Sequence, residues 1–171
     1  MPITLRPIEP EEVDAVQALI EADPGYAGRV TGLPPGPADA QSLLMMVPPD
    51  LPVERKTVYG IRDETGDLVG LLDVLRGYPD EATAYVGLLQ VRADLQGRGL
   101  GRAAHDAWLG VVRDWPEIRT LRLSVVATNA EVAAPFWEAL GYRPVGEPVP
   151  YRYAGLETTA QRYERPLDPS A

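Results

Sequence analysis

The sequence predicts one mixed domain, of the α/β or α+β class, in which helices cover a single β-sheet. Its length of 171 residues suits one hydrophobic core. Apolar residues make up 45% of the chain, as in ordinary globular proteins. Strand-like and helix-like patterns interleave without an internal repeat, which favours one layered domain spanning residues 1–171.

The N-terminal third is expected to be mainly helical. A short strand at 3–6 precedes a helix at 10–22 that has one apolar face. Residues 23–37, which become rich in glycine and proline, are expected to form an irregular loop. A second short helix is predicted over residues 38–46, before a pair of prolines.

The centre of the chain is rich in predicted strands. Lys56 to Arg62, the almost continuous apolar run Leu68 to Leu75, and Ala84 to Val91 each have a strand pattern. Polar turns separate them, and the acidic turn at 63–67 lacks the ligand spacing of a calcium loop. The three strands predict an antiparallel meander, and no metal site is predicted.

A long helix is predicted from Leu100 to Trp115, because apolar residues recur along it at helical spacing. On this helix His105, the single histidine, is expected to face solvent, whereas Trp108 and Trp115 belong to the core. Beyond it the predicted elements are a strand, a helix closed by a glycine, and two final strands: 120–126, 133–140, 142–145 and 160–165.

Composition and charge narrow the classes of function. The net charge of −9 disfavours sequence-independent binding to nucleic acid or to an anionic membrane, and mildly favours a cationic substrate such as an amine. The chain has 0 cysteines, so it has no disulfide, no thiolate metal site and no cysteine nucleophile. No secretory signal and no membrane-spanning run is recognisable, so we expect a cytoplasmic protein.

The most informative segment is the run Gln96-Gly97-Arg98-Gly99-Leu100-Gly101-Arg102, which lies between a strand and a helix. The first N–H groups of a helix lack internal partners, and glycines allow a phosphate to approach them closely. Arg98 and Arg102 add positive charge around the same anion. A dinucleotide-binding turn would need a third glycine at 102, and a Walker loop would need Gly-Lys-Ser or Gly-Lys-Thr, so neither pattern fits.

This segment resembles the signature of the GNAT superfamily of N-acetyltransferases, Gln/Arg-x-x-Gly-x-Gly/Ala, which Gln96, Gly99 and Gly101 satisfy. The strand 85–91 before it and the later segment Phe136 to Tyr142 extend the resemblance from about 57 to 142. It implies a mixed sheet of about six to seven strands with about four helices and splayed central strands. Residues 1–50 would form the acceptor side, 57–142 the cofactor-binding core, and 143–171 the C-terminal strands.

The resemblance also assigns roles to particular residues. Acetyl-CoA would be the cosubstrate, with its pyrophosphate on the backbone amides from Gln96 to Arg102. Its pantetheine arm would pair with the backbone of Leu89 and Val91, between the two splayed parallel strands, and would contact Asn129. The acceptor would be an amine of a small molecule or a peptide, and a homodimer is common in such enzymes.

The sequence departs from the family pattern in the later helix. The tyrosine that often protonates the departing thiolate is replaced by Trp137, whose indole N–H is not a usable proton source. Pro135 lies within the same predicted helix and would remove a backbone hydrogen bond there. The general acid is therefore not assigned, although Tyr151 and Tyr153 are candidates.

Direct transfer to an amine needs a base and a donor to the developing oxyanion. Asp73 lies inside an apolar strand, where burial would raise its pKa, so it is a candidate base or amine binder; the alternative is a structural aspartate paired with Arg76. The backbone N–H of Val91 is the candidate oxyanion donor. The candidate acceptor-pocket residues are Tyr26, Tyr78 and Tyr85.

Two other functions remain open at this level. One is a catalytically silent acyl-CoA-binding sensor or scaffold with the same fold, which the missing tyrosine favours. The other is a nucleotide-binding protein with a convergent anion turn. The acceptor itself has no recognisable sequence pattern, because the N-terminal segment that would bind it matches no motif.

Overall fold

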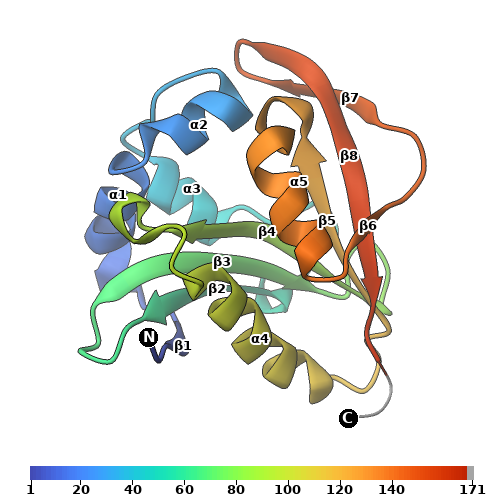
Figure 1. The fold of residues 1–171 in the computed structure, drawn as a ribbon, viewed down its shortest axis with the longest axis horizontal. Helices are drawn as coiled ribbons and strands as arrows, with labels where there is room; N and C mark the ends of the chain where they lie inside the picture. Colours follow the sequence, from blue (N-terminus) through green and yellow to red (C-terminus); the bar gives the residue numbers. More distant parts are fainter. Residues whose placement is uncertain (169–171) are drawn as a thin grey trace.

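The computed structural model describes residues 1–168. Within this range eight strands form one sheet, and five α-helices pack around it (Figure 1). The strand order is β1-β2-β3-β4-β5-β8-β6, with β7 paired to β8. The strands are β1 Thr4–Pro7, β2 Lys56–Arg62, β3 Leu68–Arg76, β4 Thr83–Val91, β5 Thr120–Val126, β6 Arg143–Pro144, β7 Val149–Tyr153 and β8 Leu156–Pro166. The α-helices are α1 Val13–Glu21, α2 Pro24–Thr31, α3 Asp39–Met45, α4 Leu100–Arg113 and α5 Ala130–Ala139.

The predicted mixed sheet and the central antiparallel meander are both confirmed. Strands β2, β3 and β4 pair antiparallel in chain order, and β1 pairs with the outer edge of β2. Helices cover both faces of this meander, which explains why β3 is apolar along almost its whole length. Val16 of α1 and Ala40 of α3 pack on one face, whereas Trp108 of α4 and Trp137 of α5 pack on the other.

The strands β4 and β5 are parallel neighbours that separate after a short stretch. Their pairing runs from Thr83 only to Tyr85, which lies opposite Arg122. In the ladder with β3, Asp73 pairs with Leu88 and Val74 pairs with Val86, so Gly87 is an extra residue on β4. Such a β-bulge bends its strand and increases the local twist. The bulge therefore lies beside the point where β4 leaves β5, and the expected splayed strands are present.

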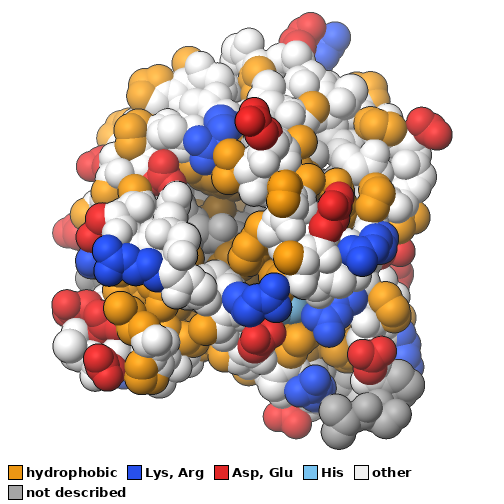
Figure 2. Space-filling view, viewed as in Figure 1, with side chains coloured by type: hydrophobic (Ala, Val, Ile, Leu, Met, Phe, Trp, Pro, Cys, Tyr) orange, Lys and Arg blue, Asp and Glu red, His pale blue; other side chains and the backbone are white. Residues whose placement is uncertain are grey.

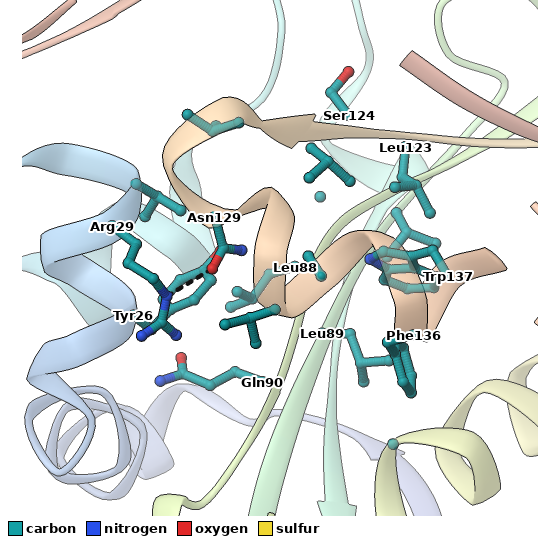
Figure 3. Close-up of a pocket in the computed structure, with 18 of the residues that line it drawn as sticks. Tyr26, Arg29, Leu88, Leu89, Gln90, Leu123, Ser124, Asn129, Phe136 and Trp137 are labelled. Carbon is teal, nitrogen blue, oxygen red and sulfur yellow. Dashed lines mark hydrogen bonds between the residues drawn. The ribbon is translucent and has the colours of Figure 1, made fainter. Parts of the chain in front are cut away.

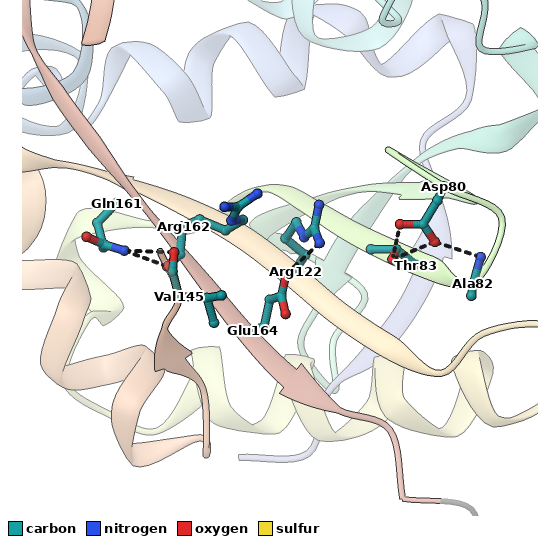
Figure 4. A network of polar contacts seen from close by, with 8 residues as sticks. All are labelled: Asp80, Ala82, Thr83, Arg122, Val145, Gln161, Arg162 and Glu164. Carbon is teal, nitrogen blue, oxygen red and sulfur yellow. Dashed lines mark hydrogen bonds and ion pairs between the residues drawn. The ribbon is translucent and has the colours of Figure 1, made fainter. Parts of the chain in front are cut away.

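On its other side β5 is held firmly by β8. The antiparallel ladder extends from Thr120 to Val126, and Arg122 forms an ion pair of 2.5 Å with Glu164 across it (Figure 4). The turn before β4 is fixed by Asp80, which accepts hydrogen bonds from the Ala82 N–H and the Thr83 hydroxyl, each at 3.0 Å. These contacts anchor the paired ends of β4 and β5, so that the two strands diverge towards their C-terminal ends.

The prediction that His105 faces solvent is wrong. His105 is 1% exposed, and its Nε2 lies 3.0 Å from the hydroxyl oxygen of Tyr142, which is itself buried. The ring also contacts the aromatic rings of Trp108 and Trp137 edge-on. Burial lowers the pKa of His105 to about 4, so the imidazole is neutral in the folded protein. Helical spacing alone placed it one step off the core-facing stripe, and two of its aromatic partners, Trp137 and Tyr142, come from a distant segment of the chain.

Three further predictions need correction. The segment 23–37 is not only a loop, because Asp23 caps the helix α2. The helix α5 begins at Ala130, three residues before the predicted start, and contains Pro135 as expected. Strand β7 falls in a proline-containing segment that gave no strand signal, and it forms a hairpin with β8. The sheet therefore has more strands, and the described chain more helices, than the sequence suggested.

Candidate active site

A cavity of about 960 Å³ occupies the gap that opens between β4 and β5. The helix α2 and the strand β7 lie along it, and the N-terminus of α4 and the helix α5 complete its walls. Figure 2 shows the molecule hollowed on this face, with hydrophobic and Lys or Arg side chains around the opening. Figure 3 shows its interior, where side chains from α2, β4, β5 and α5 meet. A cavity of this size accommodates a small ligand together with part of a larger one.

The edge of β4 that faces the cavity has free backbone groups. The Arg92 N–H donates to the carbonyl of Val69 on β3 at 2.8 Å. Because backbone direction alternates along a strand, the N–H groups of Leu89 and Val91 point away from β3, towards the side where β5 has already separated. The Val91 carbonyl accepts a hydrogen bond of 3.0 Å from Nε2 of Gln96. The two N–H groups are left available to a ligand in the cavity.

The glycine turn leads into α4 with its backbone uncovered. Gly97 and Gly99 have φ angles of +75° and +82°, and a Cβ on either would meet no atom within 4 Å. The first helical bond at this end is made by the Ala103 N–H to the carbonyl of Gly99, at 3.0 Å. The preceding amides of the first turn therefore have no helical acceptor and face open space. Unpaired N–H groups at the positive end of a helix dipole are a favourable arrangement for an anion.

The third glycine of the turn, Gly101, is required by helix packing. A Cβ on Gly101 would lie 3.2 Å from two ring atoms of Phe136 on α5, so this glycine allows α4 and α5 to approach closely. Arg102 lines the cavity and also donates to the carbonyl of Ala139 at 3.1 Å, which ties the same two helices together. Arg98 is exposed and is not among the cavity-lining residues, so of the two predicted arginines only Arg102 is placed there.

The helix α2, which sequence analysis missed, spans the gap between the two diverging strands. At its N-terminus Asp23 accepts a hydrogen bond of 3.2 Å from the Tyr26 N–H and another of 3.0 Å from Nε2 of Gln96. At its other end Nε of Arg29 donates to Oδ1 of Asn129 at 2.7 Å (Figure 3). The Asp-Pro pair at 23–24 is a helix-start signal that could have revealed this element.

Tyrosine side chains surround the half of the cavity nearest to α2 and β7. Tyr26 and Tyr85 line it as predicted, and Tyr151 and Tyr153 from β7 join them. Tyr78 is not a lining residue; its ring packs edge-on against Tyr85 with centroids 5.5 Å apart. Burial raises the pKa of Tyr26 to about 12 and also raises the pKa of Tyr85. The hydroxyl of Tyr151 already donates to the carbonyl of Val30 at 2.8 Å.

Asp73 lies directly behind the bulge rather than in the cavity wall. Its Oδ1 is 2.7 Å from Nζ of Lys56, and both side chains are largely buried. Arg76 is not its partner, because that guanidinium pairs with Glu117 at 2.5 Å. A Cβ on Gly87 would come within 2.6 Å of Oδ2 of Asp73, so the absence of a side chain at this cavity-lining glycine makes room for the carboxylate. Burial raises the pKa of Asp73, and the Lys56 ammonium opposes that rise.

The other predicted residues of the site are brought together. Leu89, Val91, Gln96, Gly97, Leu100 and Asn129 all line the same cavity, and so does Trp137 at the position of the missing tyrosine. Among residues 1–168, no group of three or more His, Asp or Glu side chains is placed to hold a metal ion. No helix in that part of the chain is long and apolar enough to cross a membrane.

Comparison with known proteins agrees with this geometry. The family model described as "Acetyltransferase (GNAT) family" matches residues 38–142. An acetyltransferase structure from Thermus thermophilus has a TM-score of 0.76 and 27% sequence identity, with 97% of each chain covered.

Two more distant structures share the fold. The ribosomal-protein-S18-alanine N-acetyltransferase of Escherichia coli has a TM-score of 0.69 at 18% identity, covering 99% of this chain and 97% of its own. The spermidine N-acetyltransferase of Vibrio cholerae, solved with CoA and spermine, has a TM-score of 0.67 at 14% identity, covering 96% and 95%. No protein of curated function matches the sequence. Because the family model covers more than half of the chain, the protein belongs to the GNAT family of acetyltransferases.

Proposed function

We propose that this acetyltransferase moves an acetyl group from acetyl-CoA directly to an amine of a small molecule or a peptide. The observation that carries the proposal is the continuity of one cavity along the gap between β4 and β5. One end of this cavity has the uncovered amides of the α4 N-terminus, and the other end has the tyrosines near α2 and β7. The free edge of β4 connects the two ends.

The end of the cavity at α4 suits CoA. The amides from Gly97 to Arg102 would bind the pyrophosphate, and Arg102, which lines the cavity, would add positive charge near it. The Gln96 N–H is not among them, because it donates to the Ala93 carbonyl at 3.4 Å. The free N–H groups of Leu89 and Val91 would pair with the pantetheine arm as an added strand would. Oδ1 of Asn129 is taken by Arg29, so Asn129 would offer its amide nitrogen to that arm.

Transfer in this arrangement is direct. The chain has no cysteine to carry the acetyl group, so the amine nitrogen forms its bond to the thioester carbon while the carbon–sulfur bond breaks. Because the Val91 N–H pairs with the pantetheine arm in this arrangement, it is not free to stabilise the negative charge on the carbonyl oxygen, and the oxyanion donor is left unassigned. The sulfur leaves as a thiolate, a modest barrier because free thiols have a pKa of about 8.5. One proton must leave the attacking amine.

Asp73 is our proposed acceptor for that proton. Its carboxylate lies next to Gly87, a residue of the cavity wall, and the proton would pass to it from the bound amine through water. Burial raises the pKa of its carboxyl group towards the range in which a base works near neutral pH. The Lys56 ammonium, 2.7 Å away, opposes that rise by stabilising the ionised carboxylate.

The proposed function is tested by release of CoA from acetyl-CoA with a panel of amines that includes amino acids, polyamines and a peptide N-terminus. We expect turnover that depends on at least one amine and yields its N-acetyl derivative, detected by mass spectrometry. Tight binding of acetyl-CoA without turnover on any amine would instead indicate a silent sensor. A rise in melting temperature with ATP but not with CoA would indicate a nucleotide-binding protein.

The role of the glycine turn is tested by Gly99→Ala, with Gly66→Ala as the matched control. Both glycines have a positive φ and open space around a new Cβ, so both changes should cost about 1 kcal/mol of folding stability. Only Gly99→Ala should weaken CoA binding in calorimetry, by about 10-fold, because it disturbs the amides that face the anion. Equal CoA affinity in the two variants would show that the pyrophosphate does not bind at this turn.

The role of Asp73 is tested by a double-mutant cycle with Lys56. Either Lys56→Met or Asp73→Leu alone should lose about 3–5 kcal/mol of stability, because each leaves one buried charge without its partner. The double variant should regain most of that loss. If Asp73 accepts the proton, the folded double variant remains at least about 100-fold less active. Recovery of activity together with stability would show that the pair is purely structural.

A further inference from the structure

We call the half of the cavity near α2 and β7 the acceptor half, because the acceptor amine would bind there. Two side chains in this half have N–H groups that donate to no described residue. Gln90 is 4% exposed, and its Nε2 is buried without a hydrogen-bond partner among residues 1–168. Buried amide groups in folded proteins are nearly always paired, so an unpaired one in a cavity wall points to a ligand. Arg29 uses Nε for Asn129, and no carboxylate of the described chain lies within salt-bridge distance of its guanidinium.

Both side chains point into the same half of the cavity. Leu89 and Val91 pack towards the face of the sheet that α4 covers, so Gln90 between them points to the opposite face, where α2 lies. Figure 3 shows the Gln90 amide and the Arg29 guanidinium directed into one part of the cavity, next to Tyr26. Both residues line that cavity, together with the tyrosines of the acceptor half.

The charges in this region favour a negative group on the ligand. Among the described residues that line the cavity, only Asp23, Arg29 and Arg102 are charged, despite the net charge of −9 on the whole chain. Both oxygens of Asp23 already accept hydrogen bonds, one from the Tyr26 N–H and one from Gln96. Arg102 lies on α4 at the CoA end. In the acceptor half, the terminal nitrogens of Arg29 and Nε2 of Gln90 therefore donate to no described residue. The carboxylate of Asp23 already accepts two hydrogen bonds.

We infer that the acceptor amine carries a carboxylate, and that Arg29 and Gln90 bind it. The guanidinium fork and the amide N–H₂ group both donate, which matches the two acceptor oxygens of a carboxylate. The surrounding tyrosines would cover an apolar or aromatic side chain. An amino acid has these three features, namely amine, carboxylate and side chain. This inference rests on the proposed function, because it names the substrate class of that site.

Matched pairs of acceptors test the inference. We expect kcat/KM for phenylalanine, leucine and methionine to exceed that for their amides and their decarboxylated amines by at least about 10-fold. Equal use of an acid and its amide would overturn the inference while leaving the transferase intact. If no amine is turned over, calorimetry with CoA-loaded protein compares N-acetylphenylalanine with its amide. Tighter binding of the acid would support the carboxylate site even though the transferase proposal fails. Equal binding of the acid and the amide would contradict both proposals.

Variants assign the preference to the two residues. Gln90→Leu and Arg29→Gln should each reduce the preference for the acid at least about 5-fold, mainly through KM of the acid. The affinity for CoA should stay unchanged in Gln90→Leu, as it should in the control Arg113→Gln at the exposed end of α4. Arg29→Gln also changes the hydrogen bond to Asn129, so its effect on the acid preference is judged after correction for any change in CoA affinity. Gln90→Leu should not lower the melting temperature, since Nε2 has no protein partner to lose. Weaker CoA binding with an unchanged preference would show that these donors serve CoA and would overturn the inference.

Discussion

The separation of β4 from β5 is the constraint on which the rest of the structure depends. The turn at Asp80 fixes β4 at its N-terminal end, and β8 holds β5 along its whole length. The extra residue Gly87 then bends β4 away. Strands of a sheet normally pair their backbone donors. Here the N–H groups along one edge of β4 are left unpaired, and that edge lines a cavity. The same glycine makes room for Asp73, so the bulge links the strand edge to the buried ion pair.

The helix α2 joins the two sides of the gap and thereby connects the two halves of the site. At its N-terminus Asp23 contacts Gln96 in the glycine turn, and in its last turn Arg29 contacts Asn129 beyond β5. The Thr128 hydroxyl donates to the Arg29 carbonyl and strengthens the second attachment. Residues that would hold CoA are thus hydrogen-bonded to residues that would hold the acceptor. This arrangement is a physical route by which binding at one end could order the other.

Local signals in the sequence were sufficient for the meander, for α4 and for the glycine turn. Each is a contiguous segment with its own apolar period or its own glycines, so no distant partner is needed to recognise it. His105, the Lys56–Asp73 pair and the donors of Gln90 and Arg29 were not predictable in this way. Each depends on which residues the topology brings together, such as Tyr142 beside α4 or Arg29 beside Asn129. The proposed class of acceptor therefore rests on the residues that line the cavity.

Amide hydrogen exchange at Leu89 and Val91 tests the central claim most directly. The account predicts that saturating CoA slows exchange of these two N–H groups by at least about 10-fold, together with the amides of the α4 N-terminus, because the ligand pairs with the free edge of β4. Slower exchange at the glycine turn with no change at Leu89 and Val91 would contradict it. The separation of β4 from β5 would then not be the feature that binds the cosubstrate.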